Sequence, residues 1–169
     1  LRLGGIAGGA YPKSVLCATI ARCENHGKVA YAGDMPFDRV GGIIGESFKT
    51  STKMCVNRGA VSSQSNLGEE SKIGDSWVAG IAAFVKFDVI CCDNFGAVSS
   101  TGCHRTNTAG IVATPHNKLV IADCTNFGKV EASNDSPAIM GGVVASIRRE
   151  AHIINGVNRG HIYFAGASP

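Results

Sequence analysis

The sequence predicts an all-β protein, a right-handed parallel β-solenoid of about five coils with roughly 32 residues in each coil. A Cys-x-Asn-x-Gly motif occurs four times, and a fifth copy differs only in having glycine at the cysteine position. The motif asparagines are 32, 37, 32 and 32 residues apart. A second element, Gly/Ala-Gly-Ile/Val, precedes every copy, so the two elements alternate five times. A fixed period of this length indicates repeats that bury their apolar faces only by stacking on one another.

The second element is expected to form a backbone corner at the start of each repeat. Its five copies begin at Gly4, Gly41, Ala79, Ala109 and Gly141. Glycine is suited to a corner because it accepts a positive φ, or a close approach of another backbone, without a Cβ clash.

Short segments with alternating apolar residues predict the strands between these corners. An aliphatic residue follows each motif glycine by two positions, at Val29, Val61, Val98, Val130 and Ile162. Alternation at period two is typical of a strand with its aliphatic side chains inside and its Lys, Ala or His side chains outside. Residues 87–91 and 118–122 predict further strands for the same reason.

Stacked coils place equivalent residues of successive repeats about 4.8 Å apart. The motif asparagines are therefore expected to form a ladder in which each amide bonds to its neighbour: Asn25, Asn57, Asn94, Asn126 and Asn158. The motif cysteines should form an adjacent column of free, buried thiols, because parallel Cβ vectors do not suit a disulfide: Cys23, Cys55, Cys92 and Cys124. Cys91 should point away from that column, outward or at a corner.

The length of the chain, 169 residues, favours one repeat domain over residues 1–169. The repeats are expected at about 3–39, 40–77, 78–107, 108–138 and 139–169. Neither end carries an obvious polar cap, which predicts a piece of a longer polypeptide or a subunit that assembles end to end.

Composition and motif searches point away from several functions. The net charge of +3 comes without a basic run, which argues against nucleic acid as a partner. No apolar stretch reaches membrane-spanning length. No metal-ligand spacing, phosphate loop or hydrolase motif is present, so neither a metal, nor a cofactor, nor enzymatic activity is expected. A carbohydrate-active β-helix enzyme remains an alternative, although it needs carboxylates gathered on one outer face.

A possible contact surface comes from the position between the motif asparagine and glycine. This position is occupied in repeats two to five by Arg58, Phe95, Phe127 and Arg159. Two stacked phenylalanines flanked by arginines would form a small apolar patch, although plain aromatic stacking along the coils is the simpler explanation of the pattern. Tyr11 and Trp77, in or beside the longer connections, are further recognition candidates, while the acidic residues within 69–75 are expected in a solvated loop.

The joined pattern resembles the GLUG-type repeats of bacterial and protist surface proteins. The resemblance covers residues 3–164 and is most specific at residues 4–8 and 41–45, Gly-Gly-Ile-x-Gly. In repeats three to five, Ala83, Ala113 and Ala145 replace the closing glycine. The resemblance implies a secreted or surface-displayed β-solenoid, often a stalk or adhesive segment, whose partner is a protein or glycan on another cell or matrix.

We therefore expect an extracellular structural or adhesive solenoid that binds, where it binds, through its lateral face. A leucine-rich-repeat horseshoe is an alternative fold, because Cys-x-Asn ladders occur there, but the Leu-x-x-Leu-x-Leu pattern is missing. A filament subunit that stacks through uncapped ends is an alternative function, alongside the carbohydrate-active enzyme.

Overall fold

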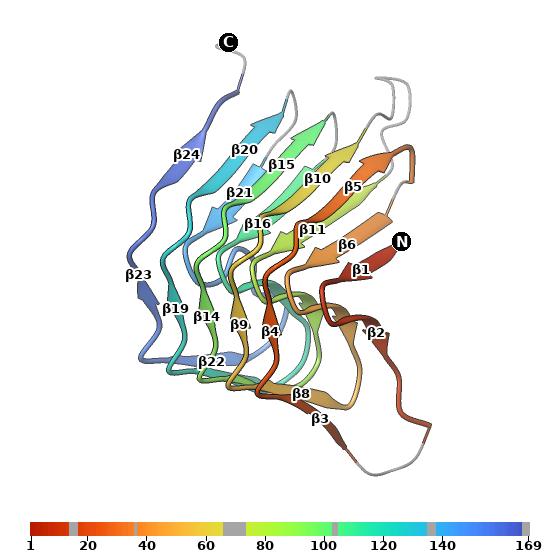
Figure 1. Ribbon diagram of the computed structural model, residues 1–169, viewed down its shortest axis with the longest axis vertical. Helices are drawn as coiled ribbons and strands as arrows, with labels where there is room; N and C mark the ends of the chain where they lie inside the picture. The colour runs from red at the N-terminus through yellow and green to blue at the C-terminus, as the bar shows by residue number, and fades with distance from the viewer. Residues whose placement is uncertain (14–16, 36, 66–73, 103–104, 135–137, 167–169) are drawn as a thin grey trace.

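The chain folds into a parallel β-solenoid of five coils, which confirms the predicted fold class (Figure 1). The computed structural model describes residues 1–13, 17–35, 37–65, 74–102, 105–134 and 138–166. These residues form 24 strands without any helix, and all their strand pairings are parallel. A helix long and apolar enough to cross a bilayer is accordingly not found among them.

Each coil contributes one strand to each of five positions around its circumference. Coil 1 contains β1 (Arg2–Gly4), β2 (Ala7–Ala10), β3 (Ala18–Ala21), β4 (Glu24–Asn25) and β5 (Val29–Gly33). Coil 2 contains β6 (Phe37–Gly41), β7 (Ile44–Ser47), β8 (Thr50–Lys53), β9 (Val56–Asn57) and β10 (Val61–Ser65). Coil 3 contains β11 (Asp75–Ala79), β12 (Ala82–Val85), β13 (Val89–Ile90), β14 (Asp93–Asn94) and β15 (Val98–Gly102). Coil 4 contains β16 (Arg105–Ala109), β17 (Val112–Pro115), β18 (Leu119–Ala122), β19 (Thr125–Asn126) and β20 (Val130–Asn134). Coil 5 contains β21 (Ala138–Gly141), β22 (Ala151–Ile154), β23 (Val157–Asn158) and β24 (Ile162–Phe164), and its second position holds only a bridge at Val144.

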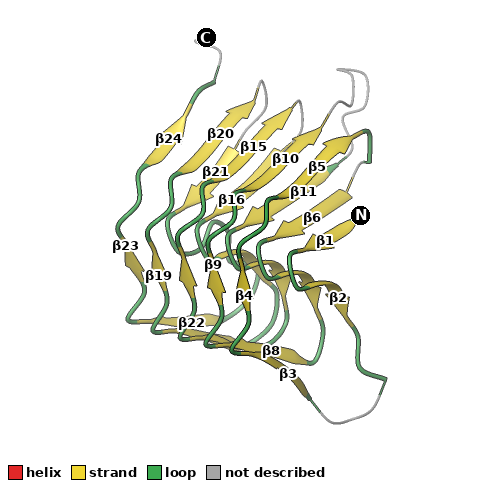
Figure 2. Cartoon of the chain, viewed as in Figure 1, coloured by secondary structure: helices red, strands yellow, loops and turns green. Residues whose placement is uncertain are grey.

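Equivalent strands of successive coils pair into five sheets, which we name A to E in the order in which the chain visits them (Figure 2). Sheet A contains β1, β6, β11, β16 and β21, and sheet B contains β2, β7, β12 and β17. Sheet C contains β3, β8, β13, β18 and β22, and sheet D contains β4, β9, β14, β19 and β23. Sheet E contains β5, β10, β15, β20 and β24.

The five motif asparagines form one continuous ladder in sheet D. The Nδ2 of each of the first four donates to the Oδ1 of the next at 2.8 Å. Every Nδ2 also donates at 2.8 Å to the carbonyl oxygen of the motif glycine in its own coil. Both amide hydrogens are therefore used in coils 1 to 4, which removes the cost of burying an unpaired amide.

The second element of each repeat packs directly against this ladder. It forms the turn between sheets A and B, and a Cβ atom on its central glycine would lie 2.1–2.5 Å from the Cγ atom of the asparagine in the same coil: Gly5 against Asn25, Gly42 against Asn57, Gly80 against Asn94, Gly110 against Asn126 and Gly142 against Asn158. Since real Cβ contacts are never this short, only glycine fits. The two sequence elements thus alternate because they meet across the coil.

This contact divides the interior of each coil into two apolar cores. One core lies between sheets A and E and consists of Val40, Val61, Val78 and Val98 with flanking side chains. The larger core lies among sheets B, C and D and contains the three buried turn isoleucines, Ile43, Ile81 and Ile111. The glycine–asparagine contact separates the two cores.

The cysteines follow the predicted arrangement. Cys55, Cys92 and Cys124 are buried in the larger core, Cys23 is partly buried in coil 1, and all four thiols are free. Cys91 is exposed, as expected for the residue beside the column. Hydrogen bonding with the Cys124 and Cys55 thiols, together with burial, raises the pKa of Cys92. The Cys92 thiol therefore stays protonated and packs as a small apolar side chain.

The corners with a left-handed backbone are occupied by residues other than glycine, although glycine adopts a positive φ most easily. The residue before each motif cysteine, or before its glycine replacement, has φ between 51° and 56°: Arg22, Met54, Cys91, Asp123 and Asn155. Among the described glycines, Gly102 alone has a positive φ. The repeat glycines are therefore required for close approach of backbone and amide, and not for backbone conformation.

Substitution of the motif glycine tests whether close stacking requires it. In coil 3 a Cβ atom on Gly96 would lie 2.0 Å from the carbonyl oxygen of Gly59, whereas on Gly27, in coil 1, it would meet only the Asn25 Oδ1 at 3.7 Å. We expect Gly96→Ala to lower the free energy of unfolding by about 3 kcal/mol or more. The matched variant Gly27→Ala should change it by less than about 1 kcal/mol. Urea unfolding followed by circular dichroism measures both, and equal effects would contradict the stacking explanation.

The smaller core also contains a buried carboxyl group whose charge should reduce stability. Asp38 is 1% exposed and accepts hydrogen bonds from Ser63 and Ser76. Burial raises its pKa more than the two hydroxyl donors lower it. Because the folded pKa lies above the unfolded value, the neutral form favours the native state, and stability falls as the pH rises through the folded pKa.

Replacing this carboxyl group by an amide should remove that loss of stability. We expect the melting temperature of Asp38→Asn to exceed that of the native chain near pH 7 and to approach it below the unfolded aspartate pKa of about 4. Asp34→Asn, which changes an exposed aspartate, is the control. A gain that is the same at both pH values would show that the charge of Asp38 is not its cause.

Candidate functional site

Sheets A and B face one another on the outside of the solenoid, because the chain turns back sharply between them (Figure 1). The side chains of Val40 and Val78 enter the smaller core, so their neighbours Arg39 and Trp77 point outward. Across the turn they meet outward side chains of sheet B. We call this region the A/B corner.

Three columns of side chains make up the A/B corner. Sheet A provides Arg2, Arg39, Trp77, Asn107 and Ile139, which are in register. Sheet B provides Gly9, Glu46, Phe84 and Thr114. The residues after sheet B provide Tyr11, Phe48, Lys86, His116 and Arg148, whose positions follow from the backbone hydrogen bonds between coils. Glu46, Trp77, Phe84, Asn107 and Thr114 are all buried although they lie outside the coil interior, since the two sheets cover them.

A buried carboxylate organises the part of the corner in coils 1 and 2. Glu46 is 2% exposed and accepts hydrogen bonds from Arg2 Nε and Tyr11 OH. Arg39 Nη1 donates to the same oxygen at 3.3 Å. The Arg2 guanidinium also lies 5.1 Å from the centre of the Tyr11 ring, which stacks on Phe48. Two cations thus share one carboxylate, which leaves an excess of positive charge.

An aromatic cluster in coils 3 and 4 continues the corner. Trp77 and Phe84 meet edge to face with ring centroids 5.9 Å apart. The Arg39 guanidinium lies 5.0 Å from the centre of the Trp77 ring and 4.9 Å from that of Phe84. Arg148 lies 5.5 Å from the Trp77 ring centre, and the His116 ring lies tilted against Phe84 with centroids 5.2 Å apart. Such contacts hold the guanidinium groups at fixed positions.

Polar atoms without partners are concentrated at the A/B corner. Seven buried side-chain nitrogen or oxygen atoms within the described ranges lack a hydrogen-bond partner, and five of them belong to this corner. The five are Arg39 Nε, Trp77 Nε1, Asn107 Nδ2, Thr114 Oγ1 and His116 Nδ1. Each unpaired buried polar group costs about 1–3 kcal/mol. The corner therefore has more unsatisfied hydrogen-bonding groups than a purely structural region would need.

The positive charge of the protein also gathers here. Six cationic side chains belong to the corner, influence its histidine or pair with Asp75 beside it: Arg2, Arg39, Lys86, Arg105, Arg148 and Arg149. Among the described residues, two carboxylates pair with these cations, Glu46 and Asp75. Asp75 bonds to Arg148 at 2.8 Å and to Arg105 at 3.3 Å.

Two titratable groups respond to this environment. Burial raises the pKa of Tyr11, and the hydrogen bond and charge of Glu46 raise it further. Burial lowers the pKa of His116, and the charges of Lys86, Arg149 and Arg148 act in the same direction. His116 is therefore held in its neutral form.

Of the contact residues expected from the sequence, two belong to this corner. Tyr11 is 44% exposed, but Trp77 is only 4% exposed, so the expectation of an accessible tryptophan is wrong. Alternation along β11 directs Trp77 outward, but the turn between sheets A and B covers it with Phe84 and Arg39.

The other expected contact residues form a separate column on the outer side of the turn between sheets D and E. Phe95 and Phe127 stack with centroids 4.5 Å apart and planes 2° apart. Arg58 lies 4.7 Å from the Phe95 ring centre, and Arg159 lies 5.8 Å from that of Phe127. The predicted order of arginine, phenylalanine, phenylalanine and arginine is present, and the rings are 41% and 39% exposed.

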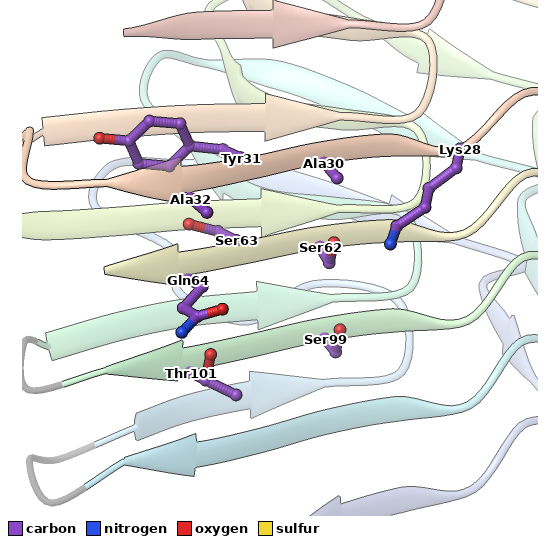
Figure 3. Close-up of a pocket in the computed structure, with 9 residues that line it drawn as sticks. All are labelled: Lys28, Ala30, Tyr31, Ala32, Ser62, Ser63, Gln64, Ser99 and Thr101. Atoms are coloured by element: carbon purple, nitrogen blue, oxygen red, sulfur yellow. The ribbon is translucent and has the colours of Figure 1, made fainter. Parts of the chain in front are cut away.

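A third surface is a shallow hollow of about 340 Å³ on the outer face of sheet E (Figure 3). Its lining is mostly small and polar, with Ser62, Gln64, Ser99 and Thr101 beside Lys28. Its lining has one charged residue and no buried polar atom that lacks a hydrogen-bond partner, so the hollow offers fewer fixed contacts than the A/B corner.

Metal chemistry finds no support in the described parts of the chain, where no three His, Cys, Asp or Glu side chains are placed to hold an ion. Glu69, Glu70 and Cys103 lie outside the described residues.

Sequence reasoning missed Arg39, Glu46, Phe84, Asn107 and Thr114. A signal for them exists, because each facing pair (39 and 46, 77 and 84, 107 and 114) is seven residues apart and flanks the turn glycine. Recognising it requires knowing that the chain turns back at that glycine.

Comparison of the chain with protein-family models, curated proteins and solved structures gave no match.

Titration of Tyr11 tests the link to Glu46. We expect the absorbance of tyrosinate that develops above the ordinary pKa of about 10 to lose the amplitude of one of the three tyrosines in Tyr11→Phe. In Glu46→Gln the ionisation of Tyr11 should shift to lower pH, because the substitution removes the negative charge beside its hydroxyl group. Glu24→Gln, at an exposed carboxylate on another face, should leave the titration unchanged. No shift in Glu46→Gln would contradict the contact.

Proposed function

We propose that this chain is a non-catalytic, adhesive segment of a surface-displayed β-solenoid of the GLUG type, and that its A/B corner binds an acidic polysaccharide. The single observation that carries the ligand proposal is the gathering of six cations, stacked aromatic rings and five unpaired polar atoms at one outer corner. Family membership and extracellular location rest on the sequence resemblance, and the packing of each repeat glycine supports the repeat definition behind it.

The orientation of the A/B corner along the solenoid favours a linear ligand. Its three columns run from Arg2 in coil 1 to Arg148 in coil 5, parallel to the stacking axis of the coils. Adjacent strands are about 4.8 Å apart, so its side chains recur at a short, regular interval. A polysaccharide with a carboxylate or sulfate on each sugar also presents charge at regular intervals.

The chemistry of the exposed groups suits sugars that carry anions. Side chains of Arg2, Arg105 and Arg148 are 50%, 60% and 40% exposed, so their guanidinium groups are accessible to carboxylates. Phe37 and Tyr11, at 45% and 44%, expose ring surface beside them, against which the apolar face of a sugar ring can pack.

Binding should depend on the arginines of the corner. We expect polygalacturonate to bind the native chain, and Arg148→Gln to weaken it about ten- to a hundredfold, since a charge-assisted hydrogen bond contributes about 1.5–3 kcal/mol. Isothermal titration calorimetry gives the affinity. Fluorescence of Trp77, the single tryptophan of the chain, reports binding at the corner.

The control is Arg159→Gln, which removes another guanidinium stacked on a ring, but on the phenylalanine column. It should bind as the native chain does. Equal loss in both variants, or equal binding of a neutral glucan, would contradict the proposed site, and equal binding of single-stranded DNA would assign the corner to polyanions in general. Release of reducing sugars would instead support the carbohydrate-active enzyme.

A further inference from the structure

Two facing side chains of coil 4 lie inside the A/B corner without hydrogen-bond partners. In coil 3 the facing pair is Trp77 and Phe84, whose rings are in contact. Continuing the register of both sheets places Asn107 opposite Thr114 in coil 4. Within the described residues Asn107 Nδ2 and Thr114 Oγ1 have no hydrogen-bond partner, although the two side chains are only 2% and 0% exposed.

The atoms beside this pair are also unpaired donors. Trp77 Nε1 in coil 3 and Arg39 Nε in coil 2 precede Asn107 along sheet A, and both are buried without a partner in the same part of the chain. Indole, guanidinium and amide N–H groups only donate, while the Thr114 hydroxyl can donate as well as accept. Together these atoms form a row of donors, which matches a ligand group that only accepts hydrogen bonds.

We propose that this row of donors is a subsite for one oxyanion group of the ligand, and that this group is a sulfate ester. The inference rests on the proposed function, because it places one acidic group of the same polysaccharide. The surrounding charge agrees with it. The guanidinium groups of Arg39 and Arg148 lie 5.0 Å and 5.5 Å from the centre of the Trp77 ring, so an anion bound beside that ring has two cations near it.

The form of the donor set favours a sulfate ester over other acidic groups. The unpaired atoms belong to separate side chains in successive coils, so they do not provide the fork that suits the two coplanar oxygens of a carboxylate. A sulfate ester presents three oxygens in a tetrahedral arrangement and carries a single charge. A phosphate monoester carries nearly two charges near pH 7, which raises the cost of transferring it from water to a buried site.

Arg148 covers this subsite from the outside. Its guanidinium lies over the Trp77 ring and donates a hydrogen bond to Asp75 at 2.8 Å. Asp75 therefore occupies the position of an anionic partner, which the sulfate group of a ligand replaces. When Arg148 turns from Asp75 to the ligand, the indole N–H of Trp77 becomes accessible to the sulfate oxygens.

The single tryptophan of the chain gives a direct test, because its indole N–H contributes one resonance to a proton–nitrogen correlation spectrum. We expect galactose monosulfate to shift this resonance downfield and to saturate it, with an affinity about fivefold or more above that of galacturonate. Thr114→Val should weaken the sulfated sugar about tenfold or more, since it removes a hydrogen bond to a charged group. Thr101→Val, the same substitution at an exposed position of sheet E, should bind as the native chain does.

Thermal unfolding without ligand separates a binding role of Thr114 from a structural one. A buried hydroxyl without a partner reduces stability, so Thr114→Val, which has an apolar side chain of the same shape, should melt at a higher temperature than the native chain. A lower melting temperature would show that the hydroxyl has a structural partner, and it would overturn the proposal. Equal weakening of sugar binding by Thr101→Val would overturn it as well.

Polygalacturonate distinguishes failure of this inference from failure of the proposed function. Suppose that it binds the native chain, but galactose monosulfate leaves the indole resonance unmoved or binds no more tightly than galacturonate. The sulfate subsite is then wrong, while the site for acidic polysaccharides stands. If neither polygalacturonate nor a sulfated galactan binds the native chain, the proposed function fails and this inference fails with it.

Discussion

The contact between a turn glycine and a ladder asparagine is the constraint on which the rest of this structure depends. Gly80 illustrates it, because a Cβ atom there would lie 2.2 Å from both Asn94 Cγ and the Gly110 carbonyl oxygen. The glycine lets the A/B turn reach across the coil, and the asparagine satisfies its amide along the stack instead of against the turn. The turn glycine and the ladder asparagine therefore depend on one another, and both recur in all five coils.

The candidate binding site is a consequence of the same contact. A turn that reaches the far side of the coil draws sheets A and B together on the outside. In coil 2 a Cβ atom on Gly45 would lie 2.6 Å from the Leu3 carbonyl oxygen and 2.8 Å from that of Arg39, which shows how closely the two sheets approach. At the equivalent Ala83 and Ala113 a Cβ atom is present, and it packs with the Trp77 and Phe84 rings in one cluster. The position of Gly45 is thus occupied by alanine in coils 3 and 4, where the corner contains the aromatic cluster.

The sequence was sufficient for the register of the repeats, and insufficient for the conformation of their corners and for what lies opposite each outer side chain. Periodicity alone placed the five asparagines, the thiol column and the stack of Phe95 on Phe127, because a fixed register turns sequence spacing into spatial alignment. It could not place the A/B corner, whose members extend from Arg2 to Arg148 and follow no repeated sequence motif. The exposure of Trp77 failed for a related reason: alternation gives the side of a strand, but not what lies opposite it.

The division between invariant and variable positions supports the choice of the A/B corner, rather than another outer face, as the proposed binding site. The glycine–asparagine frame fixes the backbone spacing, so outer side chains can vary without disturbing the cores. Around Phe95 the outer side chains form one column, in which Phe95 contacts Phe127 and Arg58 of the adjacent coils. At the A/B corner three columns converge, so Arg39 contacts a carboxylate and two rings at once. Convergence holds side chains in place before a ligand arrives, which reduces the entropy lost on binding.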